Sequence, residues 1–169
     1  MRTRNRRIPL LAFIALTAWL TLVGCSRKTV FSRYLSIDAS GWKQSDSLFF
    51  DIPPLATAGL YNAELALRAN NAYPFTSLTL IVEQRSSLSL MARTDTLTLQ
   101  MVDESGNSLG NGIGLKSYNI PLEPLALQEG DSLHVCVHHF MRRTPLPGIA
   151  DVGFSLTVGD SAQRRYAGR

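Results

Sequence analysis

The chain has 169 residues, with 17 lysine and arginine residues against 13 aspartate and glutamate residues, and a formal net charge of +4. Four of the arginines and none of the acids lie in residues 1–24, so the rest of the chain holds 13 basic and 13 acidic residues. Nucleic-acid-binding proteins need a concentrated basic surface, so this neutral remainder excludes that class and we expect no nucleic-acid partner. The length suits a single domain with its own core.

The N-terminus has the features of a bacterial lipoprotein signal peptide. Four arginines within the first seven residues precede an apolar run from Ile8 to Val23. The run closes in Leu22-Val23-Gly24-Cys25, which has the small residue before cysteine that a lipoprotein signal peptidase requires. We predict that residues 1–24 are removed and that Cys25 becomes a lipidated N-terminus carrying fatty acids such as palmitate. An uncleaved membrane anchor is the alternative, but 16 apolar residues fall short of the ~20 that span a bilayer.

Residues 25–45 are predicted to form a lipidated tether between the membrane and the domain. Ser26 is not an aspartate-type inner-membrane retention signal, which favours the outer membrane. Arg27-Lys28-Thr29 lacks an acidic surface-export signal, which favours the leaflet that faces the periplasm. Within the tether, Val30-Phe31 and Tyr34-Leu35 could pair loosely with the domain.

Residues 46–158 show the period-2 alternation of half-buried β-strands. Leu78, Leu80 and Val82, for example, share one face of a run that starts at Ser77. The alternating runs cover residues 60–70, 77–84, 94–103, 132–141 and 151–158, and turn-forming residues separate them. This pattern predicts an all-β fold: a single antiparallel β-sandwich of seven or eight strands, either jelly-roll or immunoglobulin-like. Residues 159–169 are polar and are predicted to form a disordered tail.

Several short sequence segments of the chain occur in the same order as in a known protein family. They are Leu67–Leu78 (LRANNAYPFTSL), Asp95-Thr96-Leu97, Asp103–Gly114 (DESGNSLGNGIG), Met141-Arg142 and Gly148–Phe154 (GIADVGF). Together with Tyr34 and Gly41-Trp42, they resemble the gliding-motility lipoproteins of the GldH type, although Ser108 stands where that pattern has tryptophan.

The resemblance implies a lipid-anchored cell-envelope protein that is an accessory or structural component of the gliding-motility machinery. In some gliding bacteria that machinery is linked to protein secretion. The resemblance also implies that the partners are envelope proteins of this assembly and that the chain acts through protein–protein contacts. The resemblance further implies that the chain is not an enzyme.

No constellation of catalytic residues emerges from the sequence. The glycines of Gly106–Gly114 are not followed by the helix that a phosphate loop needs, so a hairpin loop is the better interpretation. The aspartates stand at strand ends and turns, where they are expected to cap backbone amides. His139 falls on an apolar strand face, as a core residue does. We therefore predict a non-enzyme with no catalytic residue and no cofactor.

His134, Cys136 and His138 alternate on one strand face, at a spacing that could supply zinc or copper ligands. A metal site needs a further ligand, which the sequence does not identify, so an ordinary strand face without metal is the preferred interpretation. The alternative function, from a different class, is an envelope ligand-binding module for carbohydrate or metal that is unrelated to motility. Trp42 is the one tryptophan after residue 24, which leaves few flat platforms for a sugar.

Tyr73, Phe75 and Arg142 are the candidate contacts with a protein partner. Tyr73-Pro74-Phe75 lies in a predicted turn between two strands, where exposed aromatic side chains can anchor a partner. The same rings could instead fold back and close the open end of the sandwich. Arg142 precedes the proline loop, where it could pair with the rim of a sheet or mark a docking edge.

Overall fold

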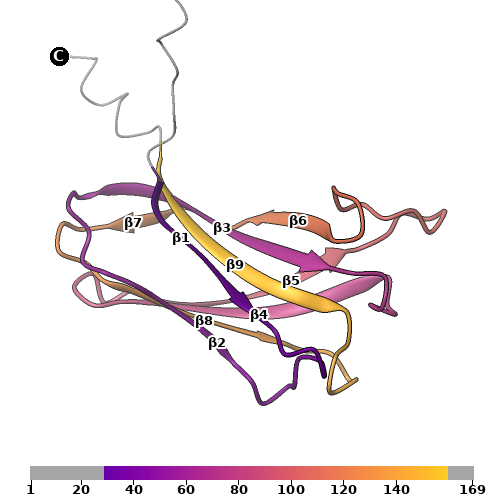
Figure 1. Cartoon of the computed structure of the whole chain (residues 1–169). Coiled ribbons are helices and arrows are strands. Elements are labelled where there is room, and N and C mark those ends of the chain that lie inside the picture. The colour runs from indigo at the N-terminus through magenta and orange to yellow at the C-terminus, as the bar shows by residue number, and fades with distance from the viewer. Residues whose placement is uncertain (1–28, 160–169) are drawn as a thin grey trace, which may run out of the picture.

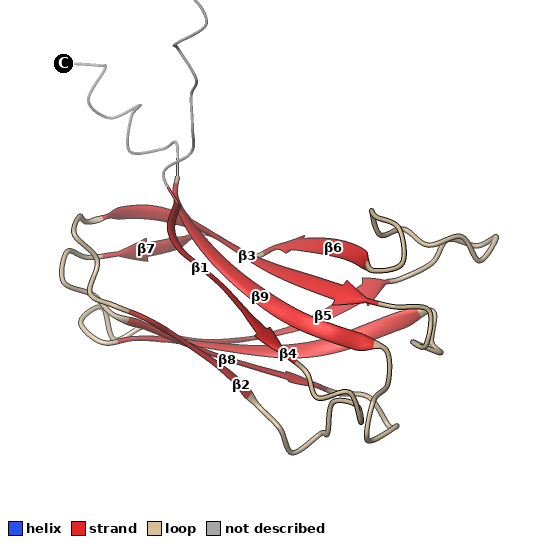
Figure 2. Cartoon of the chain, viewed as in Figure 1, coloured by secondary structure: helices blue, strands red, loops and turns tan. Residues whose placement is uncertain are grey.

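The computed structural model describes residues 29–159, in which every regular element is a β-strand (Figures 1 and 2). Two antiparallel sheets pack face to face. The first holds, in order, β1 (Thr29–Ser36), β9 (Ile149–Val158), β3 (Gly59–Ala69) and β6 (Lys116–Pro121), and β7 (Leu125–Leu127) also pairs with β3. The second holds β2 (Leu48–Ile52), β8 (Leu133–His139), β4 (Ser77–Ser86) and β5 (Ala92–Gln100). Residues 29–159 contain no helix long and apolar enough to cross a membrane.

Successive strands mostly alternate between the two sheets, which is the connectivity of a jelly roll. The chain changes sheet at each step from β1 to β4, again from β5 to β6, and at both steps from β7 to β9. Within residues 29–159, it stays in one sheet only from β4 to β5 and from β6 to β7. The predicted all-β sandwich is confirmed, and the jelly roll is the architecture observed. Nine strands are present because β1 joins the first sheet and Leu122–Pro124 separates β6 from β7.

The core lies between the inner faces of the two sheets. On β4, Leu78, Leu80 and Val82 are almost completely buried, as the alternation predicts. Across the core, the ring of Phe50 on β2 lies 5.9 Å from the ring of Phe154 on β9, measured between centroids. Burying side chains of this size contributes about 2 kcal/mol each to stability, so the inward face of each strand holds the two sheets together.

The segment from residue 29 to residue 45 belongs to the folded domain, although the sequence predicts a tether over residues 25–45. β1 pairs with β9 along its length. Phe31 of β1 lies 6.4 Å from Phe154 between ring centroids, and Trp42 is 1% exposed. Burial of these two rings fixes the segment on the sheet. The predicted signal peptide, Cys25 and the predicted tail from residue 160 lie outside the described residues.

The strand directions give the sandwich two distinct ends. Thr29 and Gly159 lie toward one end, here called the proximal end, together with the loops 53–58, 87–91 and 128–132. The loops 37–47, 70–76, 101–115 and 140–148 meet at the opposite, distal end (Figure 1). The three candidate partner contacts, Tyr73, Phe75 and Arg142, therefore all lie at the distal end.

Candidate functional site

Tyr73 and Phe75 lie in the turn between β3 and β4, but they differ in exposure. The Tyr73 ring packs against the core, and its hydroxyl donates a hydrogen bond to the carbonyl oxygen of Ser77 at 2.7 Å. Burial raises the pKa of the Tyr73 phenol, so this group stays neutral. The ring of Phe75 meets that of Tyr73 edge-on, with 5.8 Å between centroids, and Phe75 is 37% exposed. Tyr73 thus closes the distal end, whereas Phe75 remains accessible.

The turn that carries Tyr73 packs so closely on the start of β9 that only glycine fits at position 148. A Cβ atom on Gly148 would lie 2.2 Å from the backbone nitrogen of Tyr73, and the φ of Gly148 is +83°. The backbone nitrogen of Asn70 donates a hydrogen bond to the carbonyl oxygen of Gly148 at 2.8 Å. Direct backbone contact therefore joins two segments that are far apart in the sequence, Leu67–Leu78 and Gly148–Phe154.

An ion pair between Arg68 and Asp151 links the same two segments. Arg68 Nε donates to Asp151 Oδ1 at 2.7 Å, and Arg68 Nη2 donates to Asp151 Oδ2 at 2.5 Å. The hydrogen bonds to Asp151 raise the pKa of Arg68. Asp151 is 5% exposed and binds a side chain on a neighbouring strand. The expectation that each aspartate caps backbone amides is therefore wrong at this position.

Tyr34 covers this ion pair from β1. The centre of the Arg68 guanidinium lies 5.1 Å from the centroid of the Tyr34 ring, within the range of a cation–π contact. The ring also lies on Gly153, where an added Cβ would come within 2.6 Å of it. A tyrosine on an edge strand, a glycine and an arginine on two other strands thus form one packed unit on the outer face of the first sheet.

Trp42 and His139 fasten the β1–β2 loop to the β8–β9 loop, and both are buried. The backbone nitrogen of Met141 donates to His139 Nδ1 at 3.2 Å, so Nε2 carries the ring hydrogen and donates to the Trp42 carbonyl oxygen at 3.1 Å. Burial lowers the pKa of His139, which keeps the ring neutral. His139 is the core residue that its strand face predicts. Because Trp42 is buried, it offers no platform for a sugar.

The loop 101–115 joins β5 of the second sheet to β6 of the first, and its glycines with positive φ lie in two short antiparallel hairpin turns within the loop. Isolated bridges pair Val102 with Ser108 and Asn111 with Ser117. The Ser108 hydroxyl lies 2.9 Å from the hydroxyl of Tyr118. The serine that departs from the family pattern therefore makes a polar contact that holds this loop on β6.

The loops of the distal end thus bring together four of the five sequence segments, all except Asp95-Thr96-Leu97 in β5. A sequence profile of the family described as GldH lipoprotein matches residues 29–156. The chain belongs to the GldH lipoprotein family. The gliding motility lipoprotein GldH of Flavobacterium johnsoniae is 39% identical to it over 95% of this chain and all of that protein.

A second relative, described as a GldH homolog, comes from Christiangramia forsetii. It is 27% identical over 88% of this chain and 96% of its own length. Among solved structures, the globular domain of zebrafish complement 1qA protein is similar over 79% of this chain and 97% of that domain, with a TM-score of 0.41 and 11% identity. At this level, the likeness supports no functional inference.

At the distal end of this GldH-family chain, Phe75 and Arg142 stand among other accessible side chains. Phe140 is 64% exposed and Leu109 is 54% exposed, while Ile113 is fully exposed. Arg142 is exposed in the loop that follows β8. We call Phe75, Leu109, Ile113, Phe140 and Arg142 the distal rim. It combines apolar side chains with one cationic side chain, a composition that suits a protein partner.

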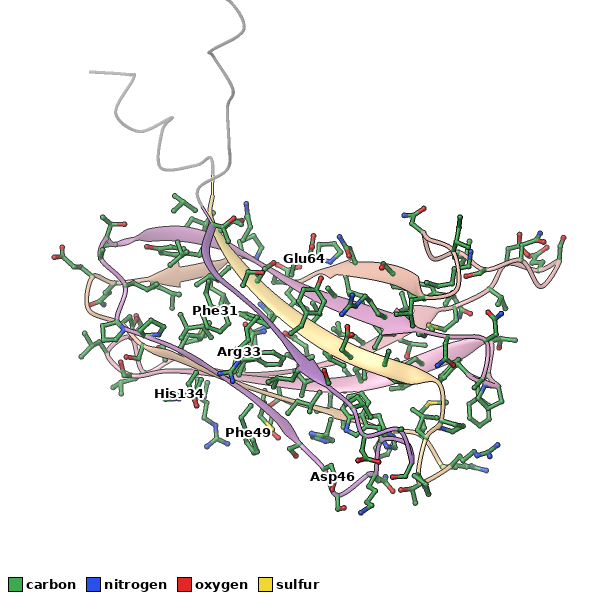
Figure 3. All side chains as sticks on the ribbon, viewed as in Figure 1. Phe31, Arg33, Asp46, Phe49, Glu64 and His134 are labelled. Carbon is green, nitrogen blue, oxygen red and sulfur yellow. The ribbon has the colours of Figure 1, made fainter. Side chains whose placement is uncertain are left out.

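The three metal-ligand candidates lie on the outer face of the second sheet of the GldH-family chain. His134 Nδ1 is 2.8 Å from Asp51 Oδ1, and both side chains are largely exposed. Figure 3 shows His134 and Phe49 on this face, below the core. Cys136 lies opposite Phe49 of β2 and is partly exposed, and His138 follows two residues further along β8. Within residues 29–159, no three His, Cys, Asp or Glu side chains are grouped to hold a metal ion.

Asp131 connects two loops at the proximal end, which goes beyond the local capping of backbone amides that the sequence predicts. The buried carboxylate accepts hydrogen bonds from the backbone nitrogens of Leu88 at 2.7 Å, Ser89 at 3.3 Å and Gln128 at 3.3 Å. The hydroxyls of Ser87 and Ser89 donate to it as well. Burial by itself would raise the pKa of Asp131, but these hydrogen bonds lower it to about 2. The carboxylate is therefore charged at neutral pH and joins two loops.

Proposed function

We propose that this GldH-family chain is a lipid-anchored cell-envelope protein that acts as an accessory or structural component of the gliding-motility machinery. The observation that carries the proposal is the 39% identity along the full length of the gliding motility lipoprotein of Flavobacterium johnsoniae. The sequence Leu22-Val23-Gly24-Cys25 supports lipidation at Cys25. The proposal assigns the chain no catalysis and no metal. It places the domain on the periplasmic side of the outer membrane, for which Ser26 and Arg27-Lys28-Thr29 are the sequence support.

The position of β1 gives this anchor a mechanical consequence. Only residues 26–28 separate Cys25 from the first paired residue, Thr29. Four steps of extended chain reach at most ~14 Å, so a lipid on Cys25 holds the domain close to the membrane surface. Confinement of this kind raises the effective concentration of the domain for partners at that surface. The distal rim lies at the end of the strands remote from Thr29, where it is free to contact an envelope partner through Phe75 and Arg142.

The anchor is tested in Flavobacterium johnsoniae cells that lack their own GldH protein and express this chain. We expect the unaltered chain to carry fatty acids on residue 25 by mass spectrometry and to restore colony spreading. The Cys25→Ala variant should remain in the unprocessed form and fail to restore spreading. Full spreading with Cys25→Ala, or an unmodified Cys25 in the active protein, contradicts the proposed anchor.

The partner contact is tested by the distal rim variant Phe75→Ala/Arg142→Ala in the same cells. Both side chains are accessible, so we expect normal abundance and lipidation but reduced spreading, and weaker crosslinking to gliding proteins. A matched control is Leu90→Ala, which removes an apolar side chain that is 85% exposed at the proximal end. Equal spreading by the rim variant and the control would remove the distal rim from the proposal.

A further inference from the structure

The five edge strands of the sandwich differ in how well they are protected against pairing with another strand. β1 has an irregular register near its start, and β2 is five residues long and carries Asp51. β6 starts at Lys116 and ends at Pro121, and β7, which also pairs with β3, has only three residues. Bulges, short length, charge and proline are the features that block edge-to-edge pairing. β5 is nine residues long, pairs with β4 in unbroken register, and contains neither lysine nor proline. Among the strands of residues 29–159, β5 is thus the edge that is open to an added strand.

The hydrogen bonds at both ends of β5 show which of its backbone groups are free. Ser86 N donates to the Met91 carbonyl oxygen at 2.9 Å, and Met101 N donates to the Thr76 carbonyl oxygen at 2.8 Å. In an antiparallel pair, hydrogen-bonded residues recur at every second position, so the odd-numbered residues of β5 bond to β4. The even-numbered residues direct their N–H and C=O groups to the open edge: Ala92, Thr94, Thr96, Thr98 and Gln100.

The two halves of β5 differ in what they offer to an added strand. In the first half, Arg93 and Asp95 point toward the core side and form an ion pair at 2.7 Å. Inward-pointing charges discourage pairing at an edge. In the second half, Leu97 and Leu99 occupy the inward positions and pack against the core. The unprotected part of the edge therefore runs from Thr96 to Gln100.

A hollow of about 520 Å³ lies beside this unprotected part, between β5, the loop 101–115 and β6. Leu99, Leu109, Asn111 and Tyr118 are among the residues that line it, and none of its lining residues is charged. Leu109 is 54% exposed there. A second hollow of about 360 Å³ continues along the same side, between Leu97 and Pro121–Pro124. The sandwich is thus open along its β5–β6 side.

We propose that the edge of β5 from Thr96 to Gln100 binds an extended segment of a partner protein as an additional strand. The backbone of that segment pairs with the free N–H and C=O groups of Thr96, Thr98 and Gln100. Every second side chain of an added strand points inward, so the segment places uncharged apolar side chains in the hollow beside Leu99 and Tyr118. Main-chain hydrogen bonds supply affinity in this mode of recognition, and the hollow supplies specificity. The inference rests on the proposed function only in naming the partner an envelope protein.

Residue 98 provides a variant that blocks the free edge and spares the sheet. The N–H of Thr98 points away from β4, so Thr98→Pro removes an edge donor without breaking a backbone hydrogen bond between β4 and β5. It does remove the hydroxyl that lies 3.3 Å from the hydroxyl of Thr79 on β4, a contact that Thr98→Val removes as well. Thr98→Val, which keeps the backbone donor, is the matched control. Thr98→Lys, which introduces a charge at the edge, is a second blocking variant that leaves the backbone unchanged.

The probe is an eight-residue peptide in which valine or leucine alternates with threonine between terminal lysines. A peptide of equal composition with its apolar residues in one block is the control. For the soluble domain that starts at residue 26, we expect the alternating peptide to slow hydrogen exchange at the amides of Thr96, Thr98 and Gln100 at least fivefold. We expect Thr98→Pro and Thr98→Lys to weaken binding of this peptide at least tenfold relative to Thr98→Val.

Three outcomes overturn the inference: no slowing of exchange with the alternating peptide, equal binding by the blocking variants and Thr98→Val, or equal binding of the two peptides. The inference is also overturned if, without peptide, exchange at these amides becomes slower as the protein concentration rises, since a second copy of the chain then occupies the edge. The measurement needs no lipid and no cells, so its failure is separate from a failure of the proposed anchor.

Discussion

The proximal and distal ends of the sandwich are held together by different chemistry. At the proximal end, the charged carboxylate of Asp131 gathers backbone and hydroxyl donors from two loops. At the distal end, close backbone packing at Gly148 and a neutral buried ring at His139 act beside the Arg68–Asp151 ion pair. The proximal end therefore depends on one ionised group, whereas the distal end also depends on the absence of a side chain at Gly148 and on a ring that must stay neutral. The end that carries the candidate partner contacts is the one more sensitive to shape.

The largest effect is expected from Gly148→Ala at the distal end. The added Cβ would meet the backbone of Tyr73 at 2.2 Å, and alanine is strained at a φ of +83°. We expect the free energy of unfolding to fall by about 4 kcal/mol, measured by urea denaturation. Gly106→Ala is the matched control, because Gly106 has the same φ but no atom near the added Cβ. A loss as small in Gly148→Ala as in the control would show that the close contact is not required.

Asp131→Asn tests the proximal end and is expected to have the second largest effect. The asparagine amide nitrogen replaces one carboxylate oxygen, so the N–H and O–H donors that face this oxygen lose their acceptor. We expect a loss of about 3 kcal/mol in the free energy of unfolding. Asp103→Asn is the control, since Asp103 accepts backbone hydrogen bonds in an exposed turn and should cost much less. Equal losses in the two variants would contradict a special role for the buried carboxylate.

Acid is expected to weaken the distal end first, with the smallest effect of the three. Burial lowers the pKa of His139 below its ordinary 6.5, so the unfolded chain binds a proton more readily than the folded chain. Stability should therefore fall as the pH drops below 6.5. The contribution of Asp131 is lost only as the pH falls from 3.8 toward 2.

This order of titration is checked by thermal unfolding of the soluble domain between pH 8 and pH 5. The His139→Gln variant should be less stable than the unaltered domain at pH 8. Its stability should, however, fall less than that of the unaltered domain between pH 8 and pH 5. His134→Gln is the control, because His134 lies largely exposed beside Asp51. If His139→Gln and the unaltered domain decline equally, the buried imidazole does not set the pH dependence.

Sequence alternation locates most strands because it is a local property. The runs at residues 60–70, 77–84 and 151–158 correspond to β3, β4 and β9 with small differences at their ends. Alternation does not locate β1. Of its eight residues only Phe31 and Leu35 are partly buried, so the segment shows little alternation of apolar and polar residues. Val30-Phe31 and Tyr34-Leu35 predict only a loose pairing with the domain, whereas the regular pairing with β9 involves a strand that is distant in the chain.

The sequence predicts that the candidate contacts lie in turns and loops, but it does not predict how they are arranged. The turn at Tyr73 and the loop at Arg142 follow from proline, glycine and polar residues between strands. The different exposure of Tyr73 and Phe75 depends on packing within the turn and against the core. The pairing of Arg68 with Asp151 depends on β3 lying beside β9, and Asp131 joins loops that are more than forty residues apart in the chain.

The amino-acid sequence by itself determines that the chain is built of β-strands with one apolar face. It also determines that residue 25 has the sequence context of a lipidation site and that the chain contains the sequence segments of the GldH family. Side-chain alternation and short motifs are local, so they can be read without knowing what lies across the core. Only the tertiary structure decides which strands become neighbours, which glycines another backbone must approach, and which strand keeps a free edge. Those properties arise when two sheets close on one core, because each then depends on residues distant in the chain.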